Sequence, residues 1–176
     1  MIISPDEGAM SRAVYFSNIL GVDMGMFYKR RDYSTVVNGK NPIVAHEFLG
    51  DSVEGKDVVI IDDMISSGES MLDVAKELKK RKAKRVFVAA TFGLFTNGLK
   101  QFDEYYEQGL ISKVLTTNVI YQTPDLLSRP YYINVDLSKY IALMIDKLNY
   151  DHSISELLDP NAKIQNSLAY YRKYHK

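Results

Sequence analysis

The sequence predicts an α/β domain with a mostly parallel sheet flanked by helices, and three observations support this prediction. Short β-rich segments alternate with amphipathic segments along the 176 residues, which is the order of successive βαβ units. Residues 58–61 (Val-Val-Ile-Ile) are apolar on both faces, as expected for a central parallel strand covered by helices on each side. Residues 70–82 follow with apolar side chains at helical spacing and charged ones between them, which predicts a helix packed on the sheet.

The N-terminal elements are a strand, a helix and a second strand. Residues 2–3 are β-branched and predict a strand that begins almost at the first residue. Residues 9–20 place apolar side chains on one side, and Gly21 stands where a C-cap glycine belongs, so we expect a helix there. Residues 24–28 are largely apolar and predict the next strand.

A polar segment separates these elements from the central strand. Residues 29–41 are polar and contain an Asn-Gly pair, which is typical of a long loop or hairpin. Residues 43–49 are apolar enough for a short strand, and residues 50–55, with a glycine at each end, predict a turn.

The second half of the chain continues the alternation. We expect strands at 85–91, 113–117 and 131–135, and helices at 98–108 and from a cap at Asp136 to about 148. From Asp151 the chain is polar and rich in tyrosine, which predicts a surface helix or arm. The expected organisation is a domain over residues 1–150 and a helical tail over residues 151–176.

Composition narrows the class of protein. Hydrophobic residues make up 46% of the chain and charged residues 25%, as in globular proteins. The formal net charge is zero, which argues against non-specific binding to nucleic acid or an anionic membrane. The chain has no cysteine, so disulfides, thiolate nucleophiles and Cys-ligated zinc are excluded. The first residues lack a basic segment followed by a long apolar one, so we expect no signal peptide and a cytoplasmic location.

The strongest local feature is the segment 62–70, Asp-Asp-Met-Ile-Ser-Ser-Gly-Glu-Ser, which joins the central strand to the helix after it. In parallel α/β sheets, ligands bind beyond the carboxyl ends of the strands. A loop that leads into a helix N-terminus offers backbone N–H groups and the positive end of the helix dipole. Three hydroxyl donors and a glycine that permits close backbone approach belong to this loop: Ser66, Ser67, Gly68 and Ser70. These residues predict a phosphate site.

The two acids need a separate explanation, because carboxylates do not bind phosphate. Asp62 and Asp63 can accept hydrogen bonds from sugar hydroxyls or hold a divalent cation that bridges to the ligand. Acids and a phosphate loop together suit a sugar phosphate. The alternative is that the acids form a strand-end turn and a serine caps the helix, and spacing alone favours neither interpretation. The loop lacks Gly-Lys-Ser/Thr, so it is not a Walker A loop.

Three further segments accompany this loop: Ser-Pro-Asp-Glu-Gly-Ala at 4–9 with Arg-Ala at 12–13, Lys-Arg-Arg at 29–31, and Glu-Gly-Lys-Asp at 54–57. Together with the loop, and in the same order, they resemble the corresponding segments of ribose-phosphate pyrophosphokinases, also called phosphoribosyl pyrophosphate synthetases. The resemblance extends from about residue 2 to residue 117. It implies the type I phosphoribosyltransferase fold.

The resemblance also implies roles for individual residues. Asp6 would be a Mg²⁺ ligand, Lys29 the catalytic lysine, and Arg31 a contact to the transferring phosphates or the ribose phosphate. Asp62, with Asp63, would hold the ribose hydroxyls, and the loop residues Ser66, Ser67, Gly68, Glu69 and Ser70 would cradle the 5-phosphate of ribose 5-phosphate. The implied reaction transfers the diphosphoryl group of ATP, the co-substrate, to the 1-hydroxyl of ribose 5-phosphate and gives phosphoribosyl pyrophosphate.

Physical chemistry is compatible with these roles, and each has a simpler alternative. Diphosphoryl transfer needs positioning and neutralisation of charge rather than a protein nucleophile, and Lys29 and Arg31 would supply positive charge. Taken alone, a Lys-Arg-Arg tripeptide is more often a solvated surface patch. Asp6 after Pro5 is also a common turn residue or helix cap.

The chain departs from the family pattern in the loop and in length. Ser66 stands where the family has a third acid, and Glu69 stands where a small residue is usual. A carboxylate there would repel a bound phosphate; the alternative is that Glu69 points outward from the first helical turn, where an acid interacts well with the dipole. The family has two similar domains, and the N-terminal one supplies most ATP contacts and a histidine metal ligand. The present chain resembles the second domain. We therefore expect a fragment or a short relative that lacks a complete ATP site on its own, with none of its three histidines as a metal ligand.

Two other functions use the same loop. A phosphoribosyltransferase would consume phosphoribosyl pyrophosphate but needs a hood for its acceptor, and no segment clearly supplies one. A regulatory subunit would bind the sugar phosphate without chemistry. The resemblance also implies a homo-oligomer. The basic and aromatic segment 170–174 is better explained as an exposed helix than as a nucleic-acid site.

Overall fold

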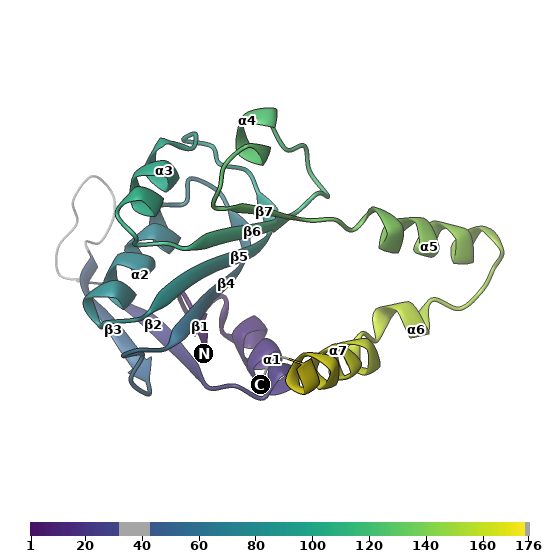
Figure 1. Cartoon of the computed structure of the whole chain (residues 1–176), viewed down its shortest axis with the longest axis horizontal. Helices are drawn as coiled ribbons and strands as arrows, with labels where there is room; N and C mark the ends of the chain where they lie inside the picture. The colour runs from purple at the N-terminus through teal and green to yellow at the C-terminus, as the bar shows by residue number, and fades with distance from the viewer. Residues whose placement is uncertain (32–42, 175–176) are drawn as a thin grey trace.

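The computed structural model describes the backbone of residues 1–31 and 43–174 and the side chains of residues 1–28 and 47–174. Within these residues, seven strands form one sheet in the order β3-β2-β1-β4-β5-β6-β7 (Figure 1). Neighbouring strands are parallel except β2 and β3, which are antiparallel. The strands are β1 (Ile2–Ser4), β2 (Met24–Arg31), β3 (Ile43–Gly50), β4 (Asp57–Ile65), β5 (Arg85–Gly93), β6 (Lys113–Thr117) and β7 (Tyr132–Val135). The predicted fold class is confirmed.

Helices lie on both faces of the sheet (Figure 1). They are α1 (Met10–Leu20), α2 (Glu69–Lys80), α3 (Lys100–Glu107), α4 (Pro124–Leu127), α5 (Ser138–Asn149), α6 (Ser155–Leu158) and α7 (Asn161–Tyr174). The larger core cluster joins one face of β4 and β5 to α2 and α3, whereas a smaller cluster joins the other face to α1. Residues alternate between the faces of a strand, so the apolar run 58–61 within β4 serves both clusters: Ile60 belongs to the first and Ile61 to the second.

Most predicted elements are present with boundaries shifted by one to a few residues, and three predictions need correction. The strand expected at 24–28 continues to Arg31, so Lys29 lies in a strand rather than in a loop; the rest of the predicted loop up to residue 41 lies outside the described residues. The central strand continues to Ile65, so the two acids after residue 61 belong to the strand. In both cases pairing with a neighbouring strand extends the element beyond its apolar residues.

The third correction concerns the cap of α5. Its N-cap residue is Leu137, which makes no side-chain cap hydrogen bond. Asp136 stands one residue earlier and accepts a hydrogen bond from the Ser138 N–H at 2.9 Å. The short helix α4 was not predicted, although Thr123 caps it by accepting from the Leu126 N–H at 3.1 Å, with proline as its first residue.

After β7 the chain runs outward as α5 and returns through α6 to α7 (Figure 1). The Gln165 side chain of α7 donates to the carbonyl oxygen of Ile19 in α1 at 3.1 Å. The expected surface helix or arm after residue 151 is thus a pair of helices, α6 and α7. Across residues 1–31 and 43–174, no helix combines the length and apolarity that crossing a membrane requires.

Candidate functional site

Carboxylates gather where β1 ends beside β4. These strands are parallel neighbours and their last pair is Ile3 with Ile60, so Asp6 in the turn after β1 and Asp62 within β4 both lie beyond that pair, at the same edge of the sheet. Arg12 of α1 reaches across from the helix: its guanidinium lies 3.3 Å from the Asp62 carboxylate and 3.8 Å from that of Asp63. Arg12 lies in a segment that resembles the family, but the sequence alone predicts no role for it. The structure shows that it holds the two acids together.

Burial raises the pKa of Asp62 above its ordinary value of 3.8, and repulsion by the carboxylates of Asp63 and Asp6 raises it further. The hydrogen bond that the Asp63 N–H donates to Asp62 at 2.8 Å opposes this rise. The 3.3 Å contact to Arg12 is too long and too exposed to reverse it. A carboxylate whose pKa is raised in this way destabilises the folded state when it is ionised. Such raised pKa values are characteristic of functional sites.

We predict that Asp62→Asn raises the melting temperature at pH 7 but not at pH 3. Because the pKa of Asp62 is raised in the folded state, its contribution to stability is complete below the unfolded value. That contribution is lost as pH rises through the folded value. Asparagine removes this loss and can still accept the hydrogen bond from the Asp63 N–H. Calorimetric melting from pH 3 to pH 7 tests the prediction, with Asp51→Asn on the surface as control. An equal shift at every pH would contradict it.

The predicted phosphate loop lies between β4 and α2, and a glycine shapes it. Gly68 is buried and has φ +88°, which non-glycine residues rarely adopt. A side chain there would overlap the ring of Phe102 from α3. The next residues begin α2, whose first N–H groups have no acceptor within the helix. Buried Met71 and Leu72 anchor this first turn to the core. The loop is thus a rigid helix N-terminus of the kind that binds anions.

Glu69 is held to one side of this helix N-terminus. Its carboxylate accepts a hydrogen bond from the Asn97 side chain at 3.3 Å. The segment after β5 is bonded to the loop as well: the N–H groups of Leu94 and Thr96 donate to the carbonyl oxygens of Ile65 and Ser66 at 2.8 and 3.0 Å. These contacts were not foreseen, because they join segments almost thirty residues apart. They support the expectation that Glu69 is directed away from a bound phosphate.

The hydroxyls of the loop differ in their surroundings. The Ser67 Oγ accepts a long hydrogen bond from the Glu69 N–H at 3.4 Å. Ser66 and Ser70 are exposed, and Ser67 is half-buried. No side-chain cap closes α2 at its N-cap residue, Gly68. The loop thus combines a helix N-terminus, which attracts anions, with two exposed hydroxyls.

Asp6 has a structural role that is visible directly. Its Oδ1 accepts hydrogen bonds from the N–H groups of Gly8 and Ala9 at 3.0 and 3.3 Å, as in a turn that opens a helix. Among the described residues, no group of three His, Cys, Asp or Glu is arranged to hold a metal ion. Mg²⁺ commonly binds through one or two carboxylates together with substrate phosphates. Asp6 and the nearby carboxylates therefore fit a magnesium ion that binds together with a phosphate ligand. They do not supply a complete set of protein ligands for the ion.

Lys29 and Arg31 lie near the end of β2, beside β1. The register pairs Ser4 with Met26, so Lys29 comes three residues later, roughly 10 Å further along the strand. On its other side, Lys29 is paired with His46 of β3. This register places Lys29 beyond the end of β1, at the sheet edge where Asp6 stands. The backbones of Lys29 and Arg31 thus lie past the end of β1, and their side chains are outside the described ones.

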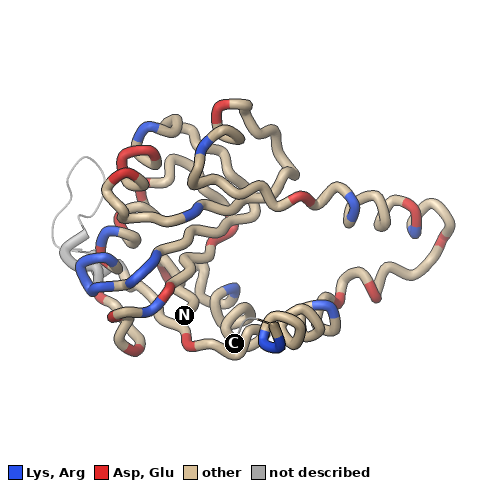
Figure 2. The backbone as a smooth tube through the Cα atoms, in the orientation of Figure 1, with Lys and Arg blue, Asp and Glu red and all other residues tan. Residues whose placement is uncertain are grey.

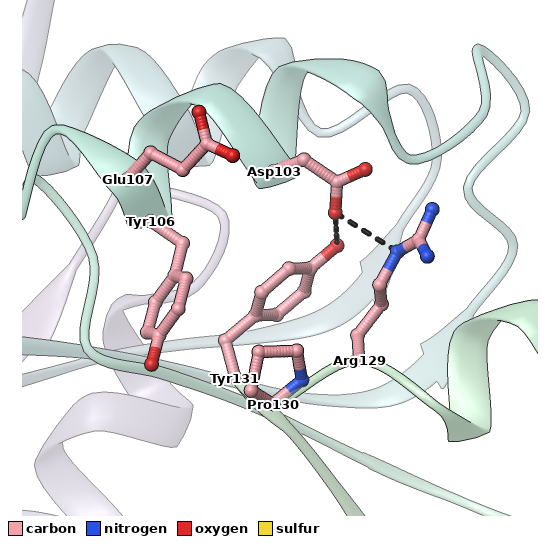
Figure 3. Close-up of a pocket in the computed structure, with 6 residues that line it drawn as sticks. All are labelled: Asp103, Tyr106, Glu107, Arg129, Pro130 and Tyr131. Carbon is pink, nitrogen blue, oxygen red and sulfur yellow. Dashed lines mark hydrogen bonds and ion pairs between the residues drawn. The ribbon is translucent and has the colours of Figure 1, made fainter.

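A separate cavity of about 310 Å³ lies between α3 and the segment before β7. In it, the Tyr131 hydroxyl donates to Asp103 at 2.8 Å, and Arg129 lies 3.0 Å from the same carboxylate (Figure 3). Arg129 also pairs with Asp125 at 3.1 Å. This cavity adjoins the amino end of β7, whereas ligands of parallel sheets bind beyond carboxyl ends. Because both acids neutralise Arg129, the network is better explained as packing between α3 and β7 than as a substrate site.

Comparison with known proteins agrees with this geometry. A ribose-phosphate pyrophosphokinase of Ureaplasma parvum is 36% identical over 124 residues, which are 70% of this chain and 36% of that protein. One of Vibrio parahaemolyticus is 31% identical over 160 residues, which are 90% of this chain and 48% of that protein. The chain thus spans less than half the length of these curated relatives.

The fold itself matches a solved structure. A phosphoribosylpyrophosphate synthetase from Mycobacterium smegmatis superposes with a TM-score of 0.67 at 24% identity, over 85% of this chain and 45% of that chain. A family model described as phosphoribosyl transferase domain matches residues 1–129, which include β1 to β6, the acid cluster and the phosphate loop. On these grounds the chain belongs to the phosphoribosyl transferase domain family.

Proposed function

We propose that this chain supplies the ribose 5-phosphate site and the catalytic loop of a ribose-phosphate diphosphokinase. The enzyme would transfer the diphosphoryl group of ATP to the 1-hydroxyl of ribose 5-phosphate and release phosphoribosyl pyrophosphate. The observation that carries the proposal is the continuous unit of β4, loop and α2, which places paired acids near the end of a strand and a helix N-terminus after a short loop. The names of the similar curated proteins support the same activity.

Each part of the site has a proposed task. The 5-phosphate binds at the start of α2, where N–H groups and the hydroxyls of Ser66, Ser67 and Ser70 surround it. Asp62 and Asp63 accept hydrogen bonds from the ribose hydroxyls while Arg12 fixes their positions. When bound, Mg²⁺ at Asp6 would offset phosphate charge.

The proposed chemistry depends on positioning and charge. Lys29 and Arg31 bring positive charge from β2 to the diphosphoryl group, where charge develops during the transfer. The 1-hydroxyl must lie in line with the phosphorus it attacks, and fixing the phosphate and the ribose hydroxyls at two ends provides that orientation. We further propose that residues 1–150 form the substrate-binding unit and that residues 151–176 are an appendage.

Calorimetric titration of the chain tests the binding step. We expect ribose 5-phosphate and phosphoribosyl pyrophosphate to bind, and ribose to bind at least about a hundredfold more weakly because it lacks the charge-assisted phosphate contacts. Ser67→Asp places a negative charge in the loop and is expected to weaken ribose 5-phosphate binding more than tenfold. Asp73→Asn, an exposed change further along α2, is the control. If neither sugar phosphate bound, the site assignment would be wrong.

A further inference from the structure

Glu69 brings a negative charge to the place where a phosphate site needs positive potential. It is the first residue of α2, and its side chain is exposed. An acid in the first turn of a helix is attracted by the N–H groups that have no acceptor within the helix. The proposed 5-phosphate would use the same N–H groups. An unrestrained Glu69 would therefore both repel the phosphate and compete with it.

The charge of Glu69 is not neutralised by a cation. Among the side chains that the structure describes, no lysine or arginine pairs with its carboxylate. The basic residues in the last turn of α2 are Lys79 and Lys80, roughly 15 Å further along the helix. Figure 2 shows Lys and Arg gathered at that end, where α2 leads into β5. Salt screens most of their effect over such a distance, so another neighbour must restrain Glu69.

That neighbour is Asn97, which belongs to a turn after β5. Its side-chain amide donates to the Glu69 carboxylate at 3.3 Å. The Gly98 N–H donates to the Phe95 carbonyl oxygen at 2.8 Å, which closes a four-residue turn around Asn97. The same segment is joined by its backbone to residues 65–66 of the phosphate loop. The Asn97 amide is thus presented to Glu69 from a turn that is attached to the loop itself.

Phe95 anchors this turn in the core. It has φ +48°, a conformation that strains a residue with a side chain and that persists only where the surroundings impose it. Its buried ring packs edge-on against the ring of Phe102, with 5.1 Å between centroids. Phe102 is also the residue that requires glycine at position 68. The turn and the phosphate loop therefore pack on one ring, which fixes their relative position.

We propose that Asn97 is a positioning residue for the sugar-phosphate site: it holds the Glu69 carboxylate away from the start of α2 and leaves that helix N-terminus to the phosphate. Its effect on the ligand is indirect and passes through Glu69. An amide suits this task, because it donates a hydrogen bond without bringing a charge of its own to the site. The inference rests on the proposed function, since it concerns how the same site binds ribose 5-phosphate.

A double-mutant cycle tests the proposal. Ribose 5-phosphate is titrated by calorimetry into the unaltered chain, Asn97→Ala, Glu69→Gln and the double variant. We expect Asn97→Ala to weaken binding about tenfold, as for a carboxylate and a doubly charged phosphate roughly 6 Å apart in water. Glu69→Gln should tighten binding about twofold, because a residual repulsion is removed. In the presence of Glu69→Gln, Asn97→Ala should change the affinity less than twofold.

The outcomes separate this inference from the proposed function. Asn166→Ala, which removes an exposed asparagine of α7, is the matched control and should leave the affinity unchanged. If Asn97 merely held the turn in place, Asn97→Ala would weaken binding equally with and without Glu69→Gln, and the proposal would be overturned. Binding by the unaltered chain with no effect of Asn97→Ala would overturn it alone. An unaltered chain that did not bind ribose 5-phosphate would refute both.

The salt dependence of the Asn97→Ala effect provides a second measurement. The titrations are repeated at 20 mM and 500 mM KCl, over which the screening length falls from roughly 20 Å to roughly 4 Å. The ratio of the affinities of the unaltered chain and Asn97→Ala should fall from about tenfold to about threefold or less, because the loss is caused by charge. A ratio that did not change with salt would contradict the proposal. Circular dichroism melting checks that every variant is folded.

Discussion

Gly68→Ala is expected to lower the free energy of unfolding by about 2–5 kcal/mol and, with it, the melting temperature by roughly 5–15 °C. Two separate costs add at this position. The backbone has φ +88°, where an L-residue is strained. The new methyl group would also overlap the ring of Phe102, which is fully buried in the core. Relief of the overlap would move α3 or the loop, so we also expect ribose 5-phosphate affinity to fall.

The chain offers a matched control for the backbone cost alone. Gly98 has φ +75° and nothing within 4 Å of the position of an added Cβ. Gly98→Ala should therefore cost only the strain, about 1–2 kcal/mol. The difference between the two variants measures the steric cost, and Phe102→Leu combined with Gly68→Ala should recover part of it. If Gly68→Ala were no more destabilising than Gly98→Ala, the loop would not be fixed by packing on α3.

Lys29→Ala is expected to lower the rate of phosphoribosyl pyrophosphate formation by about 10²–10³ while ribose 5-phosphate binding changes less than threefold. Removing one group that stabilises charge in a transition state costs a factor of this size. The proposed 5-phosphate site is at α2, whereas Lys29 lies in β2, past the last residue of β1, so we expect the two functions to be separable. Product formation from ATP, Mg²⁺ and ribose 5-phosphate gives the rate, and calorimetry gives the affinity.

The assay is run on the chain alone and on a chimera in which the chain replaces the matching part of the Vibrio parahaemolyticus relative. Lys163→Ala, an exposed lysine of α7, is the control and should leave the rate unchanged. Lys29→Arg keeps the charge but alters its geometry and is expected to recover only part of the rate. A chimera that is active and indifferent to Lys29→Ala would remove Lys29 from the catalytic machinery.

Sequence patterns predicted the elements whose burial shows in their composition. The apolar run at 58–61 indicated a strand buried on both faces, and β4 contributes to the core on both sides. Sequence patterns predicted strand ends less well where hydrogen-bonded pairing with a neighbouring strand, rather than burial, determines the structure. The polar end of β4 and the basic end of β2 are strands because β5 and β3 pair with them. Whether the end of a strand is paired depends on the neighbouring strand, so polar residues at that end do not by themselves indicate a strand.

The candidate site shows the same division. The sequence by itself determined which residues could hold a sugar phosphate, because acids, hydroxyls and glycine follow one another before a helix on a single segment. Only the tertiary structure decided how that segment is held: Arg12 joins the two acids from α1, Asn97 holds Glu69 aside, and Phe102 requires glycine at position 68. These contacts connect residues that are 28 to 51 positions apart along the chain. Contacts over that separation depend on how helices pack on the sheet, so they cannot be predicted from the local sequence.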